Sequence, residues 1–145
     1  MVKCIVEINS STVGSTGRIM FMIAETARKH GFTVYTCSAV HGNEKRIESK
    51  NHIYIGSKLD KKIHLLLAKK TGYNGCFSHF TTAQFLKKID KLQPDLIHFH
   101  NLHNCYINLP MLFDYVKKKN IPVVWTLHDC WAYTCLLYTS DAADE

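Results

Sequence analysis

Segments with the apolar pattern of β-strands alternate with segments that have the pattern of helices along most of this chain. Strand patterns occur at residues 3–9, 32–40, 52–55, 96–100 and 123–127. Helical spacing of apolar residues occurs between them, at residues 17–30, 57–70, 81–92 and 109–119. Strands that alternate with helices of this length predict a parallel sheet with right-handed crossovers. We therefore expect an α/β fold, with a Rossmann-like parallel sheet flanked by helices.

Capping residues and apolar runs refine these elements. Ser15 or Thr16 is placed to cap the first helix, and Gly31 is placed to end it. The run 123–127 is nearly all apolar, which is typical of a strand that is buried on both faces.

Length and cysteine usage bound the class of protein. A chain of 145 residues corresponds to about one domain, and none of its apolar runs approaches the length of a membrane span. The N-terminus lacks the features of a signal peptide. Six cysteines are scattered without a Cys-x-x-Cys pair, which favours reduced thiols. We expect a cytoplasmic protein, or one peripheral to the inner face of a membrane.

The chain is basic, with a formal net charge of +6. Its lysines and arginines are spread over several helices without an Arg-rich run, so we do not expect nucleic acid as a partner. The helix at 57–70 carries five lysines beside an apolar stripe of Leu59, Ile63, Leu66 and Leu67. This combination fits either a helix on an anionic membrane surface or a solvated face above an ordinary core stripe, and we favour the second.

The last eleven residues, 135–145, have an unusual sequence for a domain end. They match the translation of a transposase-based sequencing adapter, codon for codon. We therefore expect residues 135–145 to be adapter read-through rather than native sequence. Residues 1–134 would then be a truncated N-terminal domain of a longer protein.

A glycine-containing turn, Gly14-Ser15-Thr16-Gly17-Arg18, lies between the first strand and the first helix. Glycines let backbone amides approach an anion, and a helix N-terminus stabilises negative charge. The turn is neither a full Gly-x-Gly-x-x-Gly fingerprint nor a Walker A loop. An anion-binding loop and a plain tight turn are both compatible with it.

Histidines cluster where the fourth strand ends. His98 and His100 alternate on one strand face and could share a metal ion, but no acidic residue follows within the motif. We favour a hydrogen-bonded core role for His98. Ligands bind at the carboxyl ends of strands in open α/β sheets, so His100, Asn101 and His103 are better candidates for substrate contact.

A second polar pair, His128-Asp129, directly follows the last strand. A histidine there can act as a hydrogen-bond donor or general base, and a neighbouring acid can tune its pKa. The sequence does not establish that the two side chains point to the same place.

Three blocks of the sequence, at residues 8–18, 94–103 and 120–133, resemble the N-terminal half of family 4 glycosyltransferases. The resemblance is greatest to enzymes of bacterial capsule and exopolysaccharide synthesis. It implies a retaining enzyme of the two-domain GT-B fold, of which this chain is the acceptor-side half.

The resemblance also implies roles for individual residues. The loop 14–18 would approach the donor phosphates, and His128, with Asp129 beside it, would lie by the reacting sugar. Asn101 and His103 would line the cleft. The nucleotide-sugar donor site would lie mostly in a C-terminal domain, the acceptor would be a glycan or lipid-linked, and no metal or other cofactor is expected.

Two other functions stay open from the residues. The cluster His98, His100 and His103 would suit a metal-dependent hydrolase. The basic charge would suit a non-catalytic module that binds an anionic ligand or membrane. If the chain is a truncated glycosyltransferase, we expect it to be inactive by itself.

Overall fold

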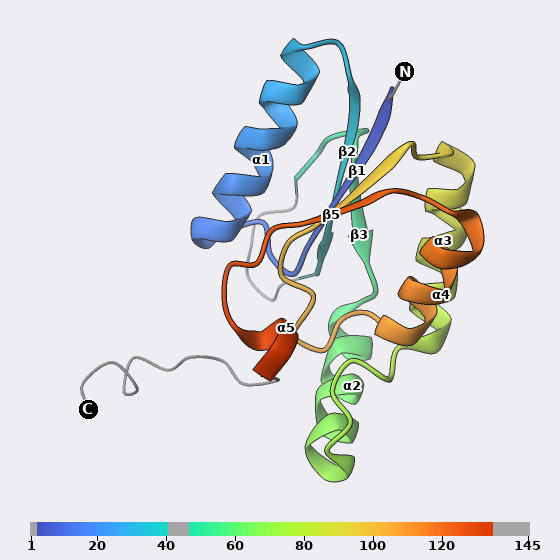
Figure 1. Cartoon of the computed structure of the whole chain (residues 1–145). Coiled ribbons are helices and arrows are strands. Elements are labelled where there is room, and N and C mark those ends of the chain that lie inside the picture. The colour runs from blue at the N-terminus through green and yellow to red at the C-terminus, as the bar shows by residue number, and fades with distance from the viewer. Residues whose placement is uncertain (1–2, 41–46, 135–145) are drawn as a thin grey trace.

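The structure is a computed structural model that describes residues 3–40 and 47–134 (Figure 1). Five parallel strands form one sheet: β1 (Cys4–Asn9), β2 (Thr33–Ala39), β3 (His52–Ile55), β4 (Leu96–Phe99) and β5 (Val123–Trp125). Their order across the sheet is β3-β2-β1-β4-β5. The expected Rossmann-like parallel sheet is thus confirmed. The expectation for residues 135–145 falls outside the described residues.

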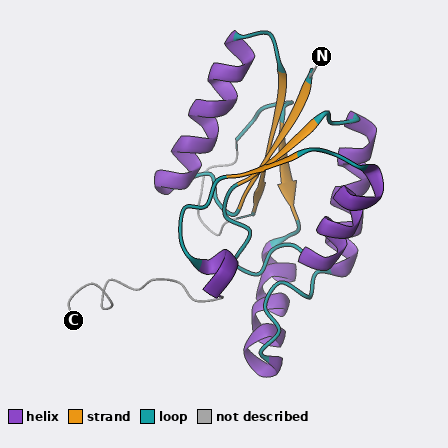
Figure 2. Cartoon of the chain, in the orientation of Figure 1, coloured by secondary structure: helices purple, strands orange, loops and turns teal. Residues whose placement is uncertain are grey.

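Helices cover both faces of the sheet (Figure 2). They are α1 (Gly14–Lys29), α2 (Lys58–Thr71), α3 (His79–Leu92), α4 (Leu109–Lys119) and the short α5 (Trp131–Thr134). Helix α1 packs on β1 and β2 from one side, while α3 and α4 lie on the other side, and α2 extends beyond the ends of the strands. No helix in the described residues is long and apolar enough to cross a bilayer.

The two faces of the sheet differ in chemistry. The face under α3 and α4 holds the main core, where Ile8 and Phe99 of the strands pack with Phe85 and Leu112 of the helices. The face under α1 begins with a small apolar cluster that includes Ile5. Because strand side chains alternate, Glu7 lies on this second face, which therefore turns polar toward the carboxyl ends of the strands.

The start of α1 differs from the prediction. The helix begins at Gly14, and its N-cap position is Val13, which makes no side-chain capping bond. Thr16 instead lies within the first turn, where its hydroxyl receives a hydrogen bond from the Asn9 side chain at 3.4 Å. The predicted end is confirmed, because Gly31 follows the helix with a φ of +87°.

Burial of β5 was also predicted wrongly. Val123 and Val124 are 41% and 47% exposed, and Leu127 beyond the strand is 51% exposed. The physical reason is the position of β5 in the sheet. It is an edge strand, and α1 packs on β1 and β2 and not on β5. An apolar run indicates a strand but does not show which neighbours cover it.

The apolar stripe of α2 is the third difference. Leu59, Ile63 and Leu66 are 67%, 50% and 66% exposed, so they do not form the core stripe that we favoured. The buried residue of this helix is His64, whose Nδ1 lies 2.8 Å from the Ser78 hydroxyl oxygen. Ser57 caps α2 as its sequence indicates, by accepting a hydrogen bond from the Asp60 amide.

Candidate functional site

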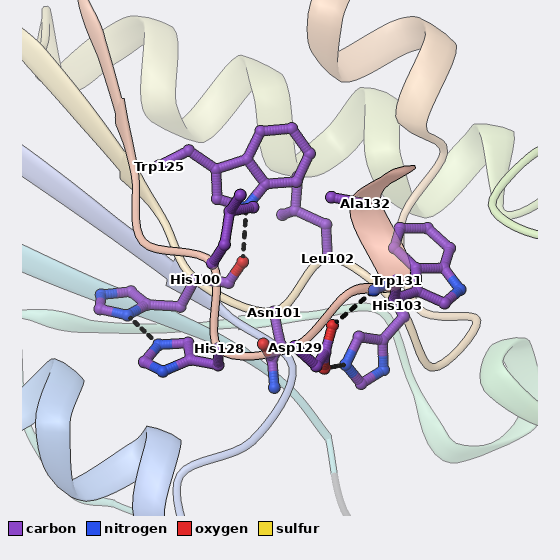
Figure 3. Close-up of a pocket in the computed structure, with 10 residues that line it drawn as sticks. His100, Asn101, Leu102, His103, Trp125, His128, Asp129, Trp131 and Ala132 are labelled. Carbon is purple, nitrogen blue, oxygen red and sulfur yellow. Dashed lines mark hydrogen bonds and ion pairs between the residues drawn. The ribbon is translucent and has the colours of Figure 1, made fainter. Parts of the chain in front are cut away.

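A small pocket lies where β4 and β5 end, at the carboxyl edge of the sheet (Figure 3). Its lining comprises His100, Asn101, Leu102, His103, Trp125, Leu127, His128, Asp129, Trp131 and Ala132. The sequence-predicted residues that follow the two strands therefore meet in space. The enclosed volume is about 10 Å³, room for roughly one water molecule, so a sugar could lie only over the mouth of this pocket.

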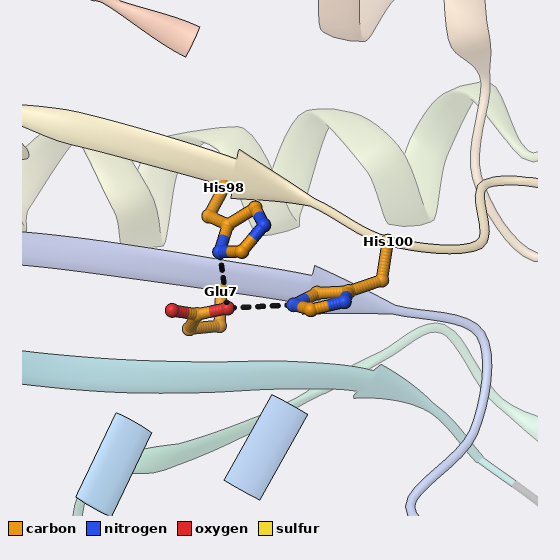
Figure 4. A group of neighbouring side chains, drawn as sticks. All are labelled: Glu7, His98 and His100. Carbon is orange, nitrogen blue, oxygen red and sulfur yellow. Dashed lines mark hydrogen bonds and ion pairs between the residues drawn. The ribbon is translucent and has the colours of Figure 1, made fainter. Parts of the chain in front are cut away.

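Glu7, in the central strand β1, anchors the polar side of this region (Figure 4). It is only 1% exposed, and its Oε2 lies 3.0 Å from His98 Nδ1 and 2.7 Å from His100 Nε2. Burial alone raises the pKa of Glu7, but the hydrogen bonds from His100 and His98 oppose this, as does the charge of either ring when it is protonated, and the pKa is lowered overall. Glu7 is therefore an ionised acceptor for two imidazole N–H groups.

The structure separates the roles expected of His98 and His100. His98 is a hydrogen-bonded core histidine, as predicted: its Nε2 lies 2.8 Å from the Thr126 hydroxyl oxygen. The expectation that His100 is available for substrate contact is wrong, because its side chain is fully buried. Both nitrogens of His100 are engaged, Nε2 by Glu7 and Nδ1 by His128.

His128 is the half-buried end of this group. Its Nε2 lies 3.0 Å from Nδ1 of His100, and the two rings stack with centroids 5.3 Å apart. Burial lowers the pKa of His128, protonation of His100 would lower it further, and Asp129 opposes the shift. A neutral ring is thus favoured at neutral pH.

Asp129 does not form a hydrogen bond with its neighbour His128. Its Oδ2 lies 2.9 Å from Nε2 of His103, and its Oδ1 accepts a hydrogen bond from the Trp131 amide at 3.0 Å. The other ring nitrogen of His103, Nδ1, is buried and has no hydrogen-bond partner among the described residues. Asp129 therefore orients His103, and it acts on His128 only through its charge.

Asn9 links the glycine turn to the end of β4. Its Oδ1 accepts hydrogen bonds from the amides of Ser10 at 2.9 Å and Asn101 at 3.3 Å. Its Nδ2 donates to the Ser11 carbonyl oxygen at 3.0 Å and to the Thr16 hydroxyl. The loop after β1 and the loop after β4 are thereby fixed side by side.

The glycine turn itself needs both of its glycines. Gly14 has a φ of +75°, which favours glycine. A Cβ on Gly17 would lie 2.5 Å from the carbonyl carbon of Thr12, too close for any other residue without a shift of the backbone. Ser15 and Arg18 are exposed at the start of α1, so the turn presents a helix N-terminus and a cation to the solvent.

Glu7, His98 and His100 also form a group whose composition would suit a metal ion, with ligand atoms within 4.8 Å of one another. His103 does not belong to it, so the three-histidine cluster considered for a hydrolase is not brought together. The hydrogen bonds of 2.7 and 3.0 Å already satisfy the shared Glu7 oxygen. We interpret the group as a hydrogen-bond network, and the absence of a metal requirement stays a prediction.

A larger groove of about 650 Å³ adjoins the small pocket. It lies between α2, α4 and α5, and it shares Trp125, Trp131 and Ala132 with the small pocket. Tyr73, Phe113 and Lys69 also line it. Its volume and its mostly apolar lining are typical of sites for small organic ligands.

Two residues of this region, Glu7 and Asn9, were not expected from the sequence. A signal for Glu7 exists: it is the one carboxylate in an otherwise apolar strand pattern, and a buried charge needs partners. Asn9 ends the same strand, where polar side chains of α/β proteins approach ligands.

Fold and site together define an α/β domain of the Rossmann-like class, with its candidate ligand site at the carboxyl ends of parallel strands. The family model described as Glycosyltransferase Family 4 matches residues 16–143, and the chain belongs to this family. A comparison with curated protein sequences found no match. Membership supports a glycosyltransferase-related role. The matched range includes residues beyond Thr134, and the adapter origin of 135–145 stays a prediction.

Proposed function

We propose that this chain is the N-terminal, acceptor-side half of a retaining glycosyltransferase with the GT-B fold. The complete enzyme would transfer a sugar from a nucleotide-sugar donor to a glycan or lipid-linked acceptor during the synthesis of a cell-surface polysaccharide. The observation that carries the proposal is the family match together with a polar site at the carboxyl ends of β1, β4 and β5.

The glycine turn supports a role in donor binding. Glycosyl transfer from a nucleotide sugar requires stabilisation of a departing diphosphate. The N-terminus of α1, with Gly14, Gly17 and exposed Arg18, offers backbone amides and a positive charge for this purpose. In our proposal a second domain completes the donor site, so this chain alone is inactive. We also propose that the reaction needs no bound metal.

The histidine site supports a contact with the reacting sugar. His128 is half-buried, lines the small pocket and contacts the buried ring of His100 through its Nε2. A neutral imidazole in this position suits a hydrogen bond with a sugar hydroxyl. Asn101 and His103 line the same pocket, and the adjoining groove of about 650 Å³ is the space that we assign to the sugar acceptor.

The exposed face of α2 supports a membrane-bound acceptor. Leu59, Ile63 and Leu66 are exposed on a helix that also carries Lys62, Lys69 and Lys70. Exposed apolar residues flanked by lysines are typical of a helix that lies on an anionic membrane surface. We therefore propose that the enzyme works at the inner face of the membrane, close to its acceptor.

The test is a comparison of this chain with a longer form that carries a second α/β domain. Each protein would be incubated with a panel of nucleotide sugars and membranes, and release of the nucleoside diphosphate would be measured. We expect release only from the longer form, with retained anomeric configuration in the product. A folded longer form that binds no nucleotide sugar, or a product with inverted configuration, would contradict the proposal.

A further inference from the structure

The polar face of the sheet contains a chain of three ionisable side chains from three different strands or strand ends. Glu7 comes from β1, His100 follows β4, and His128 follows β5. The contacts are 2.7 Å from Glu7 Oε2 to His100 Nε2 and 3.0 Å from His100 Nδ1 to His128 Nε2. The first two members are buried, and His128 is the half-buried member, which lies at the pocket (Figure 4 and Figure 3).

The positions of the protons follow from the buried end of this chain. An ionised carboxylate has only acceptor atoms, so the facing nitrogens, His100 Nε2 and His98 Nδ1, must each carry a proton. A neutral His100 then has a bare Nδ1. The contact of 3.0 Å at this Nδ1 is a hydrogen bond only if Nε2 of His128 carries a proton and donates it.

A charged His100 would reverse this assignment, but the surroundings disfavour it. The rings of His98 and His100 have centroids 4.3 Å apart and share a single carboxylate, so two charged rings would leave one positive charge uncompensated. One charged ring would balance Glu7, but His98 and His100 are both buried, and the attraction within a buried ion pair often fails to repay the cost of removing the second charge from water. One ionised carboxylate with neutral imidazoles satisfies each polar contact.

We propose that Glu7 and His100 are positioning residues that hold His128 as the Nε2–H tautomer and leave its Nδ1 as a bare hydrogen-bond acceptor. The described residues offer no hydrogen-bond partner to Nδ1 of His128. The nitrogen available to a ligand is therefore an acceptor. A ligand group that donates a hydrogen bond, such as a hydroxyl, fits it, whereas a carboxylate or phosphate oxygen does not.

The hydroxyl ligand rests on the proposed function, but the tautomer does not. The decisive measurement is therefore made on the chain itself, with ¹⁵N-labelled histidine and long-range ¹H–¹⁵N correlation NMR near neutral pH. The His128→Gln variant identifies the His128 signals by their loss. We expect a protonated Nε2 and an unprotonated Nδ1. The opposite tautomer, or a ring protonated on both nitrogens, would overturn the proposal even if the protein proves to be a glycosyltransferase.

Two variants test whether His100 is the cause. His100→Phe keeps a ring of similar size but removes the acceptor, so His128 should lose its tautomer preference and populate both forms. His98→Gln is the matched control, because His98 contacts Glu7 but not His128. An unchanged His128 in folded His100→Phe, or an equal change in His98→Gln, would overturn the positioning role. The wild-type measurement still decides the tautomer if His100→Phe does not fold.

Discussion

Asp129 pairs with His103, 26 residues away in sequence, and not with its neighbour His128. The distance from Asp129 Oδ2 to His103 Nε2 is 2.9 Å, while His128 turns to His100. Two imidazoles at this edge are thus oriented by two different carboxylates, one through an intermediate histidine and one directly. Adjacent residues in a loop point in different directions, so sequence adjacency does not indicate shared chemistry.

His128 should matter for catalysis more than for folding. In a form of the enzyme that includes a donor domain, we expect His128→Ala to reduce turnover by about 100-fold or more. Its ring is half-buried at the pocket, so the loss of packing should be small. Steady-state kinetics would be combined with circular dichroism, and His30→Ala, at an exposed position on the far end of α1, is the control. Normal turnover in folded His128→Ala would remove this residue from the site.

The glycine turn should not tolerate a side chain at Gly17. A methyl group there would lie 2.5 Å from the Thr12 carbonyl carbon, so Gly17→Ala should lower the free energy of unfolding by about 1–3 kcal/mol. Urea unfolding measures this change. Ser15→Ala, an exposed position of the same turn, should unfold like the wild type. Equal stability of the two variants would show that the loop approaches α1 less closely than the structure has it.

His52 should make the protein less stable in acid. Burial lowers the pKa of His52 to about 4, and its nitrogens contact Thr36 and Ser38. The unfolded chain has a His pKa of about 6.5, so between about pH 6.5 and 4 it binds more protons, and stability falls as the pH falls.

Urea unfolding at about pH 7.5 and about pH 5 tests this effect. His52→Phe should lose less stability between the two conditions than the wild type. Some dependence should remain, because burial also lowers the pKa of His64 and His128. His30→Phe, at an exposed position, should match the wild type. If His52→Phe loses as much stability between the two pH values as the wild type does, His52 is not a source of the pH dependence.

The Glu7 group should not hold zinc. A zinc ion needs ligand atoms at about 2.0–2.2 Å, which would require breaking both hydrogen bonds that Glu7 accepts. Protein dialysed against zinc and then against buffer should contain far less than one ion per chain by elemental analysis. One zinc ion per chain that is lost in Glu7→Ala but retained in Asp114→Ala would revive the hydrolase alternative.

The exposed stripe of α2 should bind anionic vesicles. We expect sedimentation with phosphatidylglycerol vesicles, weakened by salt, and reduced about tenfold or more in the double variant Leu59→Gln, Leu66→Gln. The double variant Val13→Gln, Met22→Gln removes similarly exposed apolar side chains from the region of α1 and should bind normally. Equal loss in both double variants would show that α2 is not the contact surface.

The sequence predicted the order of strands and helices along the chain and the parallel sheet. It also predicted that five polar residues gather at one edge of the sheet: His100, Asn101, His103, His128 and Asp129. Alternation of apolar patterns indicates the order of the elements along the chain and a parallel sheet, and parallel strands bring their carboxyl ends to the same edge. A helix cap is a local feature too: Ser57 caps α2 through the amide of Asp60, only three residues away.

Only the tertiary structure decided which of these side chains touch. Glu7 is 93 residues from His100 and reaches it because β1 and β4 are neighbours in register, Glu7 beside His98. Exposure of the α2 stripe and of β5 also depended on packing, since an apolar pattern carries no information about whether another element covers it. Local sequence determined the elements, and long-range packing determined burial and hydrogen-bond partners.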